Sequence, residues 1–153
     1  MEHPKDVGDR TTLAVMLALG EAGYDVLLPF GENMRYDLVI DDGRILSRVQ
    51  CKTGRLSKGA VIFRTASSYY HHPNPGTPSK HYQGQVDFFG VYCRATTGVY
   101  LVPIDELPNQ WSAALRVTAP RNAQTQGIRL ASRYEIGRVD LGARPRLRVP
   151  SGA

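Results

Sequence analysis

The spacing of apolar residues divides the chain into a helical first segment and a longer region of strands. Apolar side chains at Leu13, Met16, Leu17 and Ala22 follow helical spacing within a segment of strong helix formers. Gly23 is typical of the position directly after a helix. The pattern therefore predicts a helix over residues 6–22.

Seven later segments are rich in β-forming residues and are bounded by turn formers. They predict strands over residues 24–30, 36–42, 44–52, 59–66, 85–93, 98–104 and 112–118. Asp42-Gly43 indicates a tight hairpin between the second and third of these strands, and the fifth and sixth form a second hairpin. One helix followed by a run of strands is typical of an α/β or α+β sheet domain. We expect a single domain over residues 1–140 and a basic, frayed tail over 141–153.

Aromatic residues divide between the predicted core and a long loop. Phe88, Phe89, Tyr92 and Tyr100 lie in the second hairpin and are expected to pack in its core. We expect Trp111 in the core or at an interface. Residues 67–85 combine prolines, glycine, tyrosines and histidines, which predicts an exposed loop of the kind that is usually functional or disordered.

Composition narrows the class of protein. The chain has 153 residues, 42% hydrophobic and 22% charged, which fits a folded soluble domain and not a disordered one. The polar N-terminus lacks the apolar core of a signal peptide and no apolar run approaches a membrane span, so we expect a cytoplasmic protein. Cys51 and Cys93 form no spaced ligand cluster, which favours free thiols in a reducing compartment.

Charge is distributed unevenly along the chain. Residues 1–50 contain five Lys or Arg and nine Asp or Glu, a net charge of −4. Residues 51–153 contain fourteen and five, a net charge of +9. A basic region beside an acidic one fits a polyanion-binding surface next to a cation site. An ordinary solvated surface fits the charges alone equally well.

The first hairpin brings together residues suited to phosphodiester chemistry. Asp37 begins one strand, and Gln50, Cys51 and Lys52 end the next, so antiparallel pairing places them at the same end of the hairpin. Because side chains alternate along a strand, Gln50 and Lys52 share one face and Cys51 points toward the core.

A hard divalent cation requires oxygen ligands, and this end of the hairpin offers three. They are the Asp37 carboxylate, the Gln50 amide oxygen and the Cys51 backbone carbonyl; Asp9 on the helix is a candidate fourth. Lys52 adds a positive charge that can orient water or stabilise charge on a phosphate. The spacing alone also fits a surface hairpin with ordinary polar residues.

Basic, aromatic and polar residues elsewhere are candidates for holding nucleic acid. They are Arg55, Lys58, Arg64, Tyr69, Tyr70, His71, Lys80, Tyr82, Arg121, Asn122 and Gln124. The His71-His72 pair has no acidic or cysteine partner nearby, which favours exposed loop histidines over a metal site.

Over residues 4–136 the chain resembles the PD-(D/E)xK endonucleases of the group I intron homing type. The resemblance runs through DVGDRTT, GYDVLLPFGENMRYDLVIDD, RVQCKTGRL, GAVIFRTASS, VDFFGVYCRATTGVYLVPIDEL and APRNAQTQGIRLASRYEI. It implies a restriction-endonuclease-like α/β fold, with a mixed central sheet flanked by helices, and a metal-dependent DNA endonuclease that leaves 5′-phosphates.

The resemblance also assigns roles to single residues. In this subgroup a glutamine commonly occupies the acidic position before x-Lys, so Asp37, Gln50 and Lys52 are implied to be catalytic. Mg²⁺ or Mn²⁺ is the implied cofactor. Asp9 stands where the family pattern usually has a glutamate on the first helix.

Two other functions remain open at this point. A Holliday-junction resolvase or another structure-specific nuclease would use the same residues. A non-catalytic nucleic-acid-binding module would account for the single negative charge of the Asp37–Gln50 pair. For a DNA endonuclease, cutting both strands requires two sites, which predicts a homodimer or homotetramer.

Overall fold

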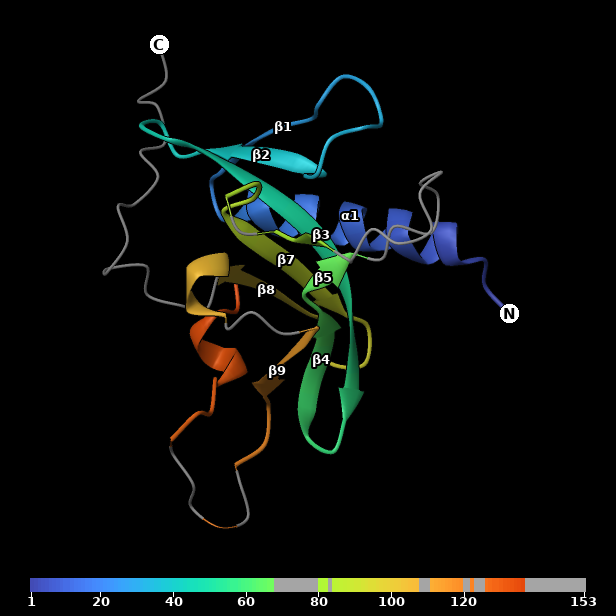
Figure 1. Cartoon of the computed structure of the whole chain (residues 1–153), viewed down its shortest axis with the longest axis vertical. Helices are drawn as coiled ribbons and strands as arrows, with labels where there is room; N and C mark the ends of the chain where they lie inside the picture. The colour runs from blue at the N-terminus through green and yellow to red at the C-terminus, as the bar shows by residue number, and fades with distance from the viewer. Residues whose placement is uncertain (68–79, 83, 108–110, 120–121, 123–125, 137–153) are drawn as a thin grey trace.

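A seven-stranded mixed sheet with one α-helix across one face organises the protein (Figure 1). This computed structural model describes residues 1–67, 80–82, 84–107, 111–119, 122 and 126–136. The elements of the large sheet and its helix are α1 (Pro4–Glu21), β1 (Asp25–Leu27), β2 (Leu38–Asp41), β3 (Leu46–Ser57), β4 (Ala60–Arg64), β7 (Phe88–Cys93), β8 (Gly98–Pro103) and β9 (Ser112–Arg116). Two short strands, β5 (Ala66–Ser67) and β6 (Lys80–His81), pair separately, and η1 (Ile104–Glu106) and η2 (Ala131–Arg133) are single 3₁₀ turns.

The long strand β3 is the centre of the sheet and crosses the molecule diagonally in Figure 1. On one side it pairs in parallel with β7, from Val49↔Phe88 to Gly54↔Cys93. On the other side it pairs antiparallel with β2 up to Val49, and with β4 from Arg55 onward. Among the described residues, none therefore pairs as a strand with residues 50–54 of β3 on that second side. We call this stretch the open edge of β3.

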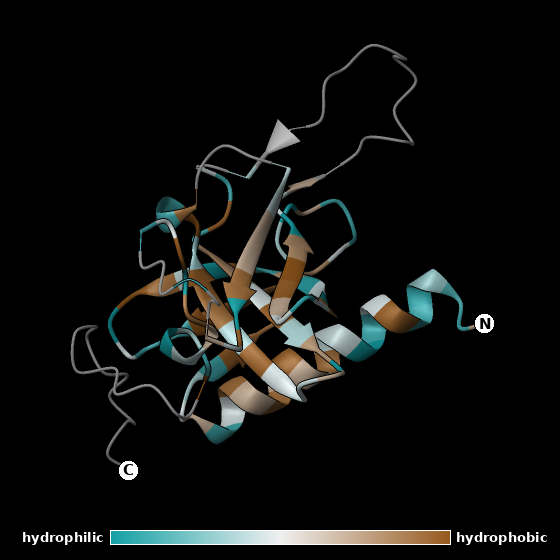
Figure 2. Cartoon of the chain, turned by 90° about the horizontal axis from the view of Figure 1, so that it is seen from below, coloured by the Kyte–Doolittle hydropathy of each residue, from teal (hydrophilic) through white to brown (hydrophobic). Residues whose placement is uncertain are grey.

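Two apolar clusters hold the sheet from its two faces. Val15 and Leu19 of α1 pack with Leu38, Val49 and Leu101 on one face. The other face is covered by a cluster that includes Val61, Phe63, Phe89, Val91, Val102 and Leu115. Figure 2 shows hydrophobic residues where α1 meets the strands and a hydrophilic N-terminal end of the helix.

The helix begins two residues earlier than the apolar spacing predicts. Proline is favoured in the first turn of a helix, and Pro4 occupies it. The His3 side chain accepts a hydrogen bond from the Lys5 amide at 3.2 Å and so caps the first turn. At the other end, the helix finishes at Glu21 and Gly23 takes a positive φ of 92°, as the sequence indicates.

The strands differ from the prediction mainly in their ends. β3 runs five residues beyond the predicted 44–52, because pairing with β7 and β4 keeps Thr53–Ser57 extended. The predicted strand 59–66 is divided at Thr65, which separates β4 from β5. Both hairpins are confirmed, as are the mixed sheet and the α/β fold class. The predicted tail 141–153 lies outside the described residues.

The predicted aromatic core is correct with one exception. Phe89 and Tyr100 are buried, and Phe88 and Tyr92 pack half-buried against the helix-side cluster. Trp111 is not a core residue, because 60% of it is exposed, and its expected place at an interface stays a prediction. It lies just before β9, where the structure uses its backbone carbonyl to accept the Thr65 amide at 2.8 Å.

Replacing Gly90 by alanine is expected to destabilise the fold by about 1–3 kcal/mol, through overpacking beneath α1. A Cβ there would lie 2.8 Å from Val15 Cγ1 and 3.1 Å from Val49 Cγ1. Chemical denaturation measures the change in unfolding free energy. Gly20→Ala is the control, because its Cβ meets nothing within 4 Å in the last turn of α1, so the change should be neutral or stabilise by up to about 1 kcal/mol. A Gly90→Ala protein as stable as wild type would contradict this account of the packing.

Candidate active site

Asp37 stands at the point where β2 stops pairing with β3. Its backbone amide donates to the Val49 carbonyl at 2.9 Å and so extends the ladder by one residue. Its Oδ2 then accepts the Cys51 amide at 2.8 Å. The carboxylate therefore replaces the backbone partner that a longer β2 would have supplied, and it is held at the start of the open edge.

The Cys51 carbonyl faces the same way as its amide. In an extended strand the N–H and C=O of one residue project toward the same side of the strand. Because the Cys51 N–H reaches Asp37 at the open edge, its carbonyl also points into that edge. A carboxylate and a carbonyl oxygen thus lie at one place, and both are ligand types that hard divalent cations prefer.

Burial changes the ionisation of the Asp37 carboxyl and of the Cys51 thiol. Burial raises the pKa of the Asp37 carboxyl above its ordinary value, although the Cys51 amide and the charge of Lys52 act to lower it. Burial, with a smaller contribution from the Asp37 charge, raises the pKa of the Cys51 thiol to about 12 against the effect of its Thr12 hydrogen bond. A thiol with that pKa stays protonated at neutral pH, so Cys51 lacks the thiolate that nucleophilic catalysis requires.

Lys52 occupies the opposite face of β3 from Cys51, as strand alternation predicts. Its Nζ donates to the Tyr82 hydroxyl at 3.1 Å and lies 4.7 Å from the centre of the Tyr82 ring. The Phe89 ring centre is 6.0 Å away. Gln50, two residues earlier on the same strand, shares this face and is half-buried. Lys52 is therefore held by an aromatic wall rather than lying free on the surface.

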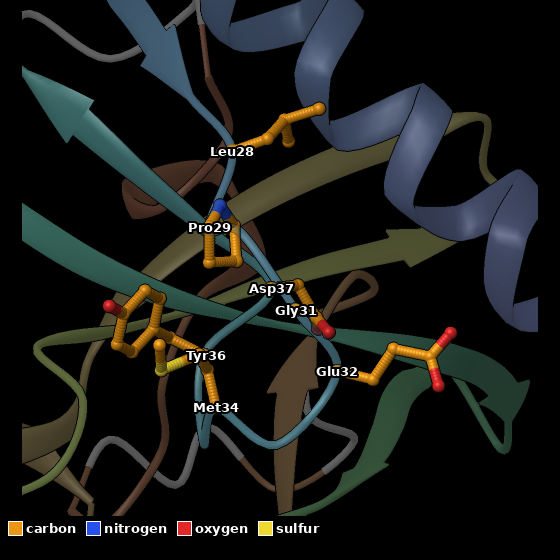
Figure 3. A pocket seen from close by; sticks show the side chains of 7 residues that line it. All are labelled: Leu28, Pro29, Gly31, Glu32, Met34, Tyr36 and Asp37. Carbon is orange, nitrogen blue, oxygen red and sulfur yellow. The ribbon is translucent and has the colours of Figure 1, made fainter.

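A pocket of about 260 Å³ opens beside Asp37, and Figure 3 shows its lining. Its walls come from the connection between β1 and β2: Leu28, Pro29, Gly31, Glu32, Met34, Tyr36 and Asp37. Tyr36 and Met34 lie on one side of the opening, and Asp37 and Glu32 lie on the other. Glu32 is a second carboxylate at the site that sequence reasoning missed, because its loop carries no strand or helix pattern.

Asp9 lies on α1 one turn before Thr12, and its side chain is exposed. Thr12 is the helix residue that reaches Cys51. Within the described ranges, no three His, Cys, Asp or Glu side chains gather closely enough to hold a metal ion. Any cation at this edge would therefore depend on carbonyl and amide oxygens as well as carboxylates.

The predicted nucleic-acid contacts other than Tyr82 fall into three groups. Arg55, Lys58 and Arg64 are exposed, and Asn122 is exposed on a turn. Arg55 pairs with Ile62, so Arg55 and Arg64 share one face of the β3–β4 ribbon. Lys80 belongs to β6. The remaining exposed-loop candidates lie outside the described residues: Tyr69, Tyr70, His71, Arg121 and Gln124.

Tyr82 requires a correction. The sequence makes it a candidate for contacting nucleic acid, but only 4% of it is exposed. Its ring packs edge-on against Phe89, with centroids 5.4 Å apart, and its hydroxyl meets Lys52. A buried ring cannot stack on a nucleic-acid base. The Tyr82 hydroxyl instead contacts Lys52.

A comparison with known protein families identifies the family to which this site belongs. A model of the PD-(D/E)XK endonuclease family matches residues 2–137. The chain belongs to the PD-(D/E)XK endonuclease family. It is therefore a DNA endonuclease, as the sequence resemblance implies, and nucleases of this family generally use divalent metals.

A solved structure has the same fold as this PD-(D/E)XK chain. The bacterial homing endonuclease I-Ssp6803I superposes with a TM-score of 0.70 and 24% identity, over 88% of this chain and 89% of that one. No curated protein matches the sequence. None of the helices in the described part of the chain has the length and apolarity that a membrane-spanning segment requires.

Proposed function

We propose that the chain is a Mg²⁺- or Mn²⁺-dependent DNA endonuclease of the homing type, with Asp37, Gln50 and Lys52 as its catalytic residues. The observation that carries the proposal is the junction at the open edge of β3. There the Asp37 carboxylate is bonded to the Cys51 amide, and the next residue is Lys52. In this arrangement, oxygen ligands for a metal ion and the positively charged Lys52 ammonium can act together on one phosphate.

The donor set fits a hard cation. The Asp37 carboxylate, the Cys51 carbonyl and the Gln50 amide oxygen would hold the ion, and Asp9 is the predicted further ligand. When bound, a divalent ion neutralises phosphate charge and makes water a better nucleophile. The half-buried Asp37 contributes the negative charge that a cation needs, and Lys52 stabilises negative charge as it develops on the phosphate.

Substrate and assembly are part of the proposal. The fold shared with a bacterial homing endonuclease supports double-stranded DNA as the substrate. Arg55, Lys58 and Arg64 carry exposed positive charge beyond the site, which suits phosphates along the duplex. Because one site cuts one strand, a homodimer or homotetramer would deliver both cuts.

Incubation with a plasmid library of randomised inserts, in Mg²⁺, in Mn²⁺ and in EDTA, tests this function. We expect cleavage that depends on the metal, leaves 5′-phosphates and cuts both strands at one recurring site. Sedimentation of the protein on the selected DNA reports the assembly. Asp37→Asn protein prepared in parallel controls for contaminating nucleases.

Other outcomes would assign a different function. Cleavage of a four-way junction, with linear duplex left intact, would indicate a structure-specific resolvase. Binding that weakens steeply with salt, without cutting in either metal, would indicate a non-catalytic nucleic-acid-binding module. Both results would contradict the proposal.

A further inference from the structure

Tyr82 lies directly behind Lys52 and is held more firmly than a surface tyrosine. It is 4% exposed, and its hydroxyl accepts a hydrogen bond from the Lys52 Nζ at 3.1 Å. Its ring is set at 85° to the Phe89 ring. The Arg35 guanidinium carbon stands 4.0 Å from the ring centre, and Arg35 Nε donates to Gln85 Oε1 at 2.5 Å. The hydroxyl therefore has a defined position.

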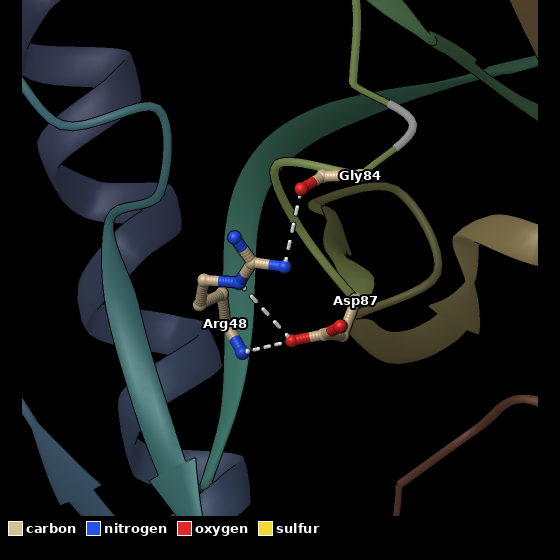
Figure 4. Close-up of polar contacts among 3 residues, drawn as sticks. All are labelled: Arg48, Gly84 and Asp87. Atoms are coloured by element: carbon tan, nitrogen blue, oxygen red, sulfur yellow. Dashed lines mark hydrogen bonds and ion pairs between the residues drawn. The ribbon is translucent and has the colours of Figure 1, made fainter.

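The turn that carries Tyr82 is anchored to the same strand as Lys52. The Tyr82 carbonyl accepts the amides of Gln85 and Val86 at 3.0 and 3.1 Å. Arg48 of β3 reaches the Gly84 carbonyl and the Asp87 carboxylate, both at 3.4 Å, as Figure 4 shows. The Arg48 amide also donates to Asp87 at 2.8 Å. Strand β3 thus carries both Lys52 and, four residues earlier, Arg48. Arg48 in turn holds the turn that brings Tyr82 to Lys52.

We propose that Tyr82 is a positioning residue that holds the Lys52 ammonium at the phosphate. This inference rests on the catalytic role proposed for Lys52. A lysine side chain has a flexible four-carbon stem, so its ammonium samples many positions unless a fixed acceptor selects one. The Tyr82 hydroxyl is that acceptor. Electrostatic stabilisation of a transition state depends on such preorganised placement of charge.

Tyr82→Phe tests the inference, because it removes the hydroxyl and keeps the ring. We expect the cleavage rate at saturating DNA and metal to fall by about tenfold, in the range seen when supporting hydrogen bonds are removed from active sites. The KM for DNA should change less than the rate, because Tyr82 is only 4% exposed and offers little surface for DNA.

Tyr100→Phe is the matched control. Tyr100 is also buried, at 3% exposure, and its hydroxyl bonds Thr96 Oγ1 at 2.9 Å near the β7–β8 turn. In thermal melts, the Tyr100→Phe protein should lose about as much stability as the Tyr82→Phe protein, but it should keep the wild-type cleavage rate. Equal rate losses in both variants, or a Tyr82→Phe protein as fast as wild type, would overturn the positioning role.

A spectroscopic measurement separates this inference from the nuclease function itself. The Lys52 ammonium signal in a ¹H–¹⁵N spectrum, assigned by its loss in Lys52→Ala, should persist in Tyr100→Phe and be lost or shifted in Tyr82→Phe. An unchanged signal in Tyr82→Phe would overturn the contact. If Lys52→Ala cuts DNA normally, the proposed catalytic role of Lys52 fails instead, whatever the spectrum shows.

Discussion

Lys52→Ala is expected to lower the rate of DNA cleavage by about 10²- to 10³-fold, the usual effect of removing a group that stabilises transition-state charge. The Lys52 ammonium lies next to the carboxylate-bearing edge, held by Tyr82 at 3.1 Å. DNA affinity, measured by fluorescence anisotropy in Ca²⁺ to suppress cutting, should stay close to wild type. Single-turnover cleavage in Mg²⁺ gives the rate.

Two further variants separate charge from packing. Lys52→Met keeps the apolar stem against Tyr82 and Phe89 but removes the ammonium, so it should lose activity as fully as Lys52→Ala. Lys5→Ala removes an equal charge from an exposed position at the start of α1 and should cut normally. If Lys52→Met retains the wild-type rate, Lys52 acts through packing and not through charge.

Asp37→Asn is expected to reduce cleavage by about 10³-fold, because it removes the carboxylate that accepts the Cys51 amide at the open edge. The asparagine side-chain oxygen can still accept that amide, so the fold should be retained. Without metal, the variant should be at least as stable as wild type. Burial disfavours the charged carboxylate, as the raised pKa of Asp37 shows, and the amide carries no charge.

Thermal melts with increasing Mg²⁺ or Mn²⁺ measure the metal site without any cleavage assay. Wild-type protein should gain about 2.7 kcal/mol of stability when the metal reaches a hundred times its dissociation constant, and Asp37→Asn should gain almost none. Asp41→Asn is the matched control, since the Asp41 carboxylate also accepts a backbone amide, that of Gly43 at 2.8 Å. Equal metal stabilisation of wild type and Asp37→Asn would place the ion elsewhere.

The elements that local signals control could be predicted from the sequence. Asp42-Gly43 forms the first hairpin turn, where Gly43 takes a φ of 82° and the Asp42 carboxylate accepts the Arg44 and Ile45 amides at 2.8 and 2.7 Å. Side-chain alternation then places Cys51 and Lys52 on opposite faces. Each of these features depends on residues a few positions apart.

The parallel pairing of β3 with β7 could not be predicted. It joins Val49 to Phe88, far apart in the sequence, and no turn links parallel strands directly. The same pairing explains why β3 extends through Gly54, whose missing Cβ leaves room for Val61 and Val91. Strand ends are set by such neighbours, which no local pattern specifies.

Tyr82 shows the same limit at the site. As a sequence position it lies beside prolines and histidines, which is typical of an exposed loop. Only the anchoring of its turn by Arg48 and the packing against Phe89 turn it inward to Lys52. Burial depends on which distant surfaces meet, so one side chain can be a plausible DNA contact in the sequence and a core residue in the fold.

The sequence by itself placed Asp37, Gln50 and Lys52 at one end of the hairpin, because they are related by one turn and a two-residue alternation. It also carried the family resemblance that the match over residues 2–137 confirms. The tertiary structure alone decided that β2 begins only after Asp37, whose carboxylate accepts the Cys51 amide, that Glu32 shares the Asp37 pocket and that the Tyr82 hydroxyl contacts Lys52. These relations arise from packing between segments distant in the chain, and only the folded arrangement brings those segments into contact.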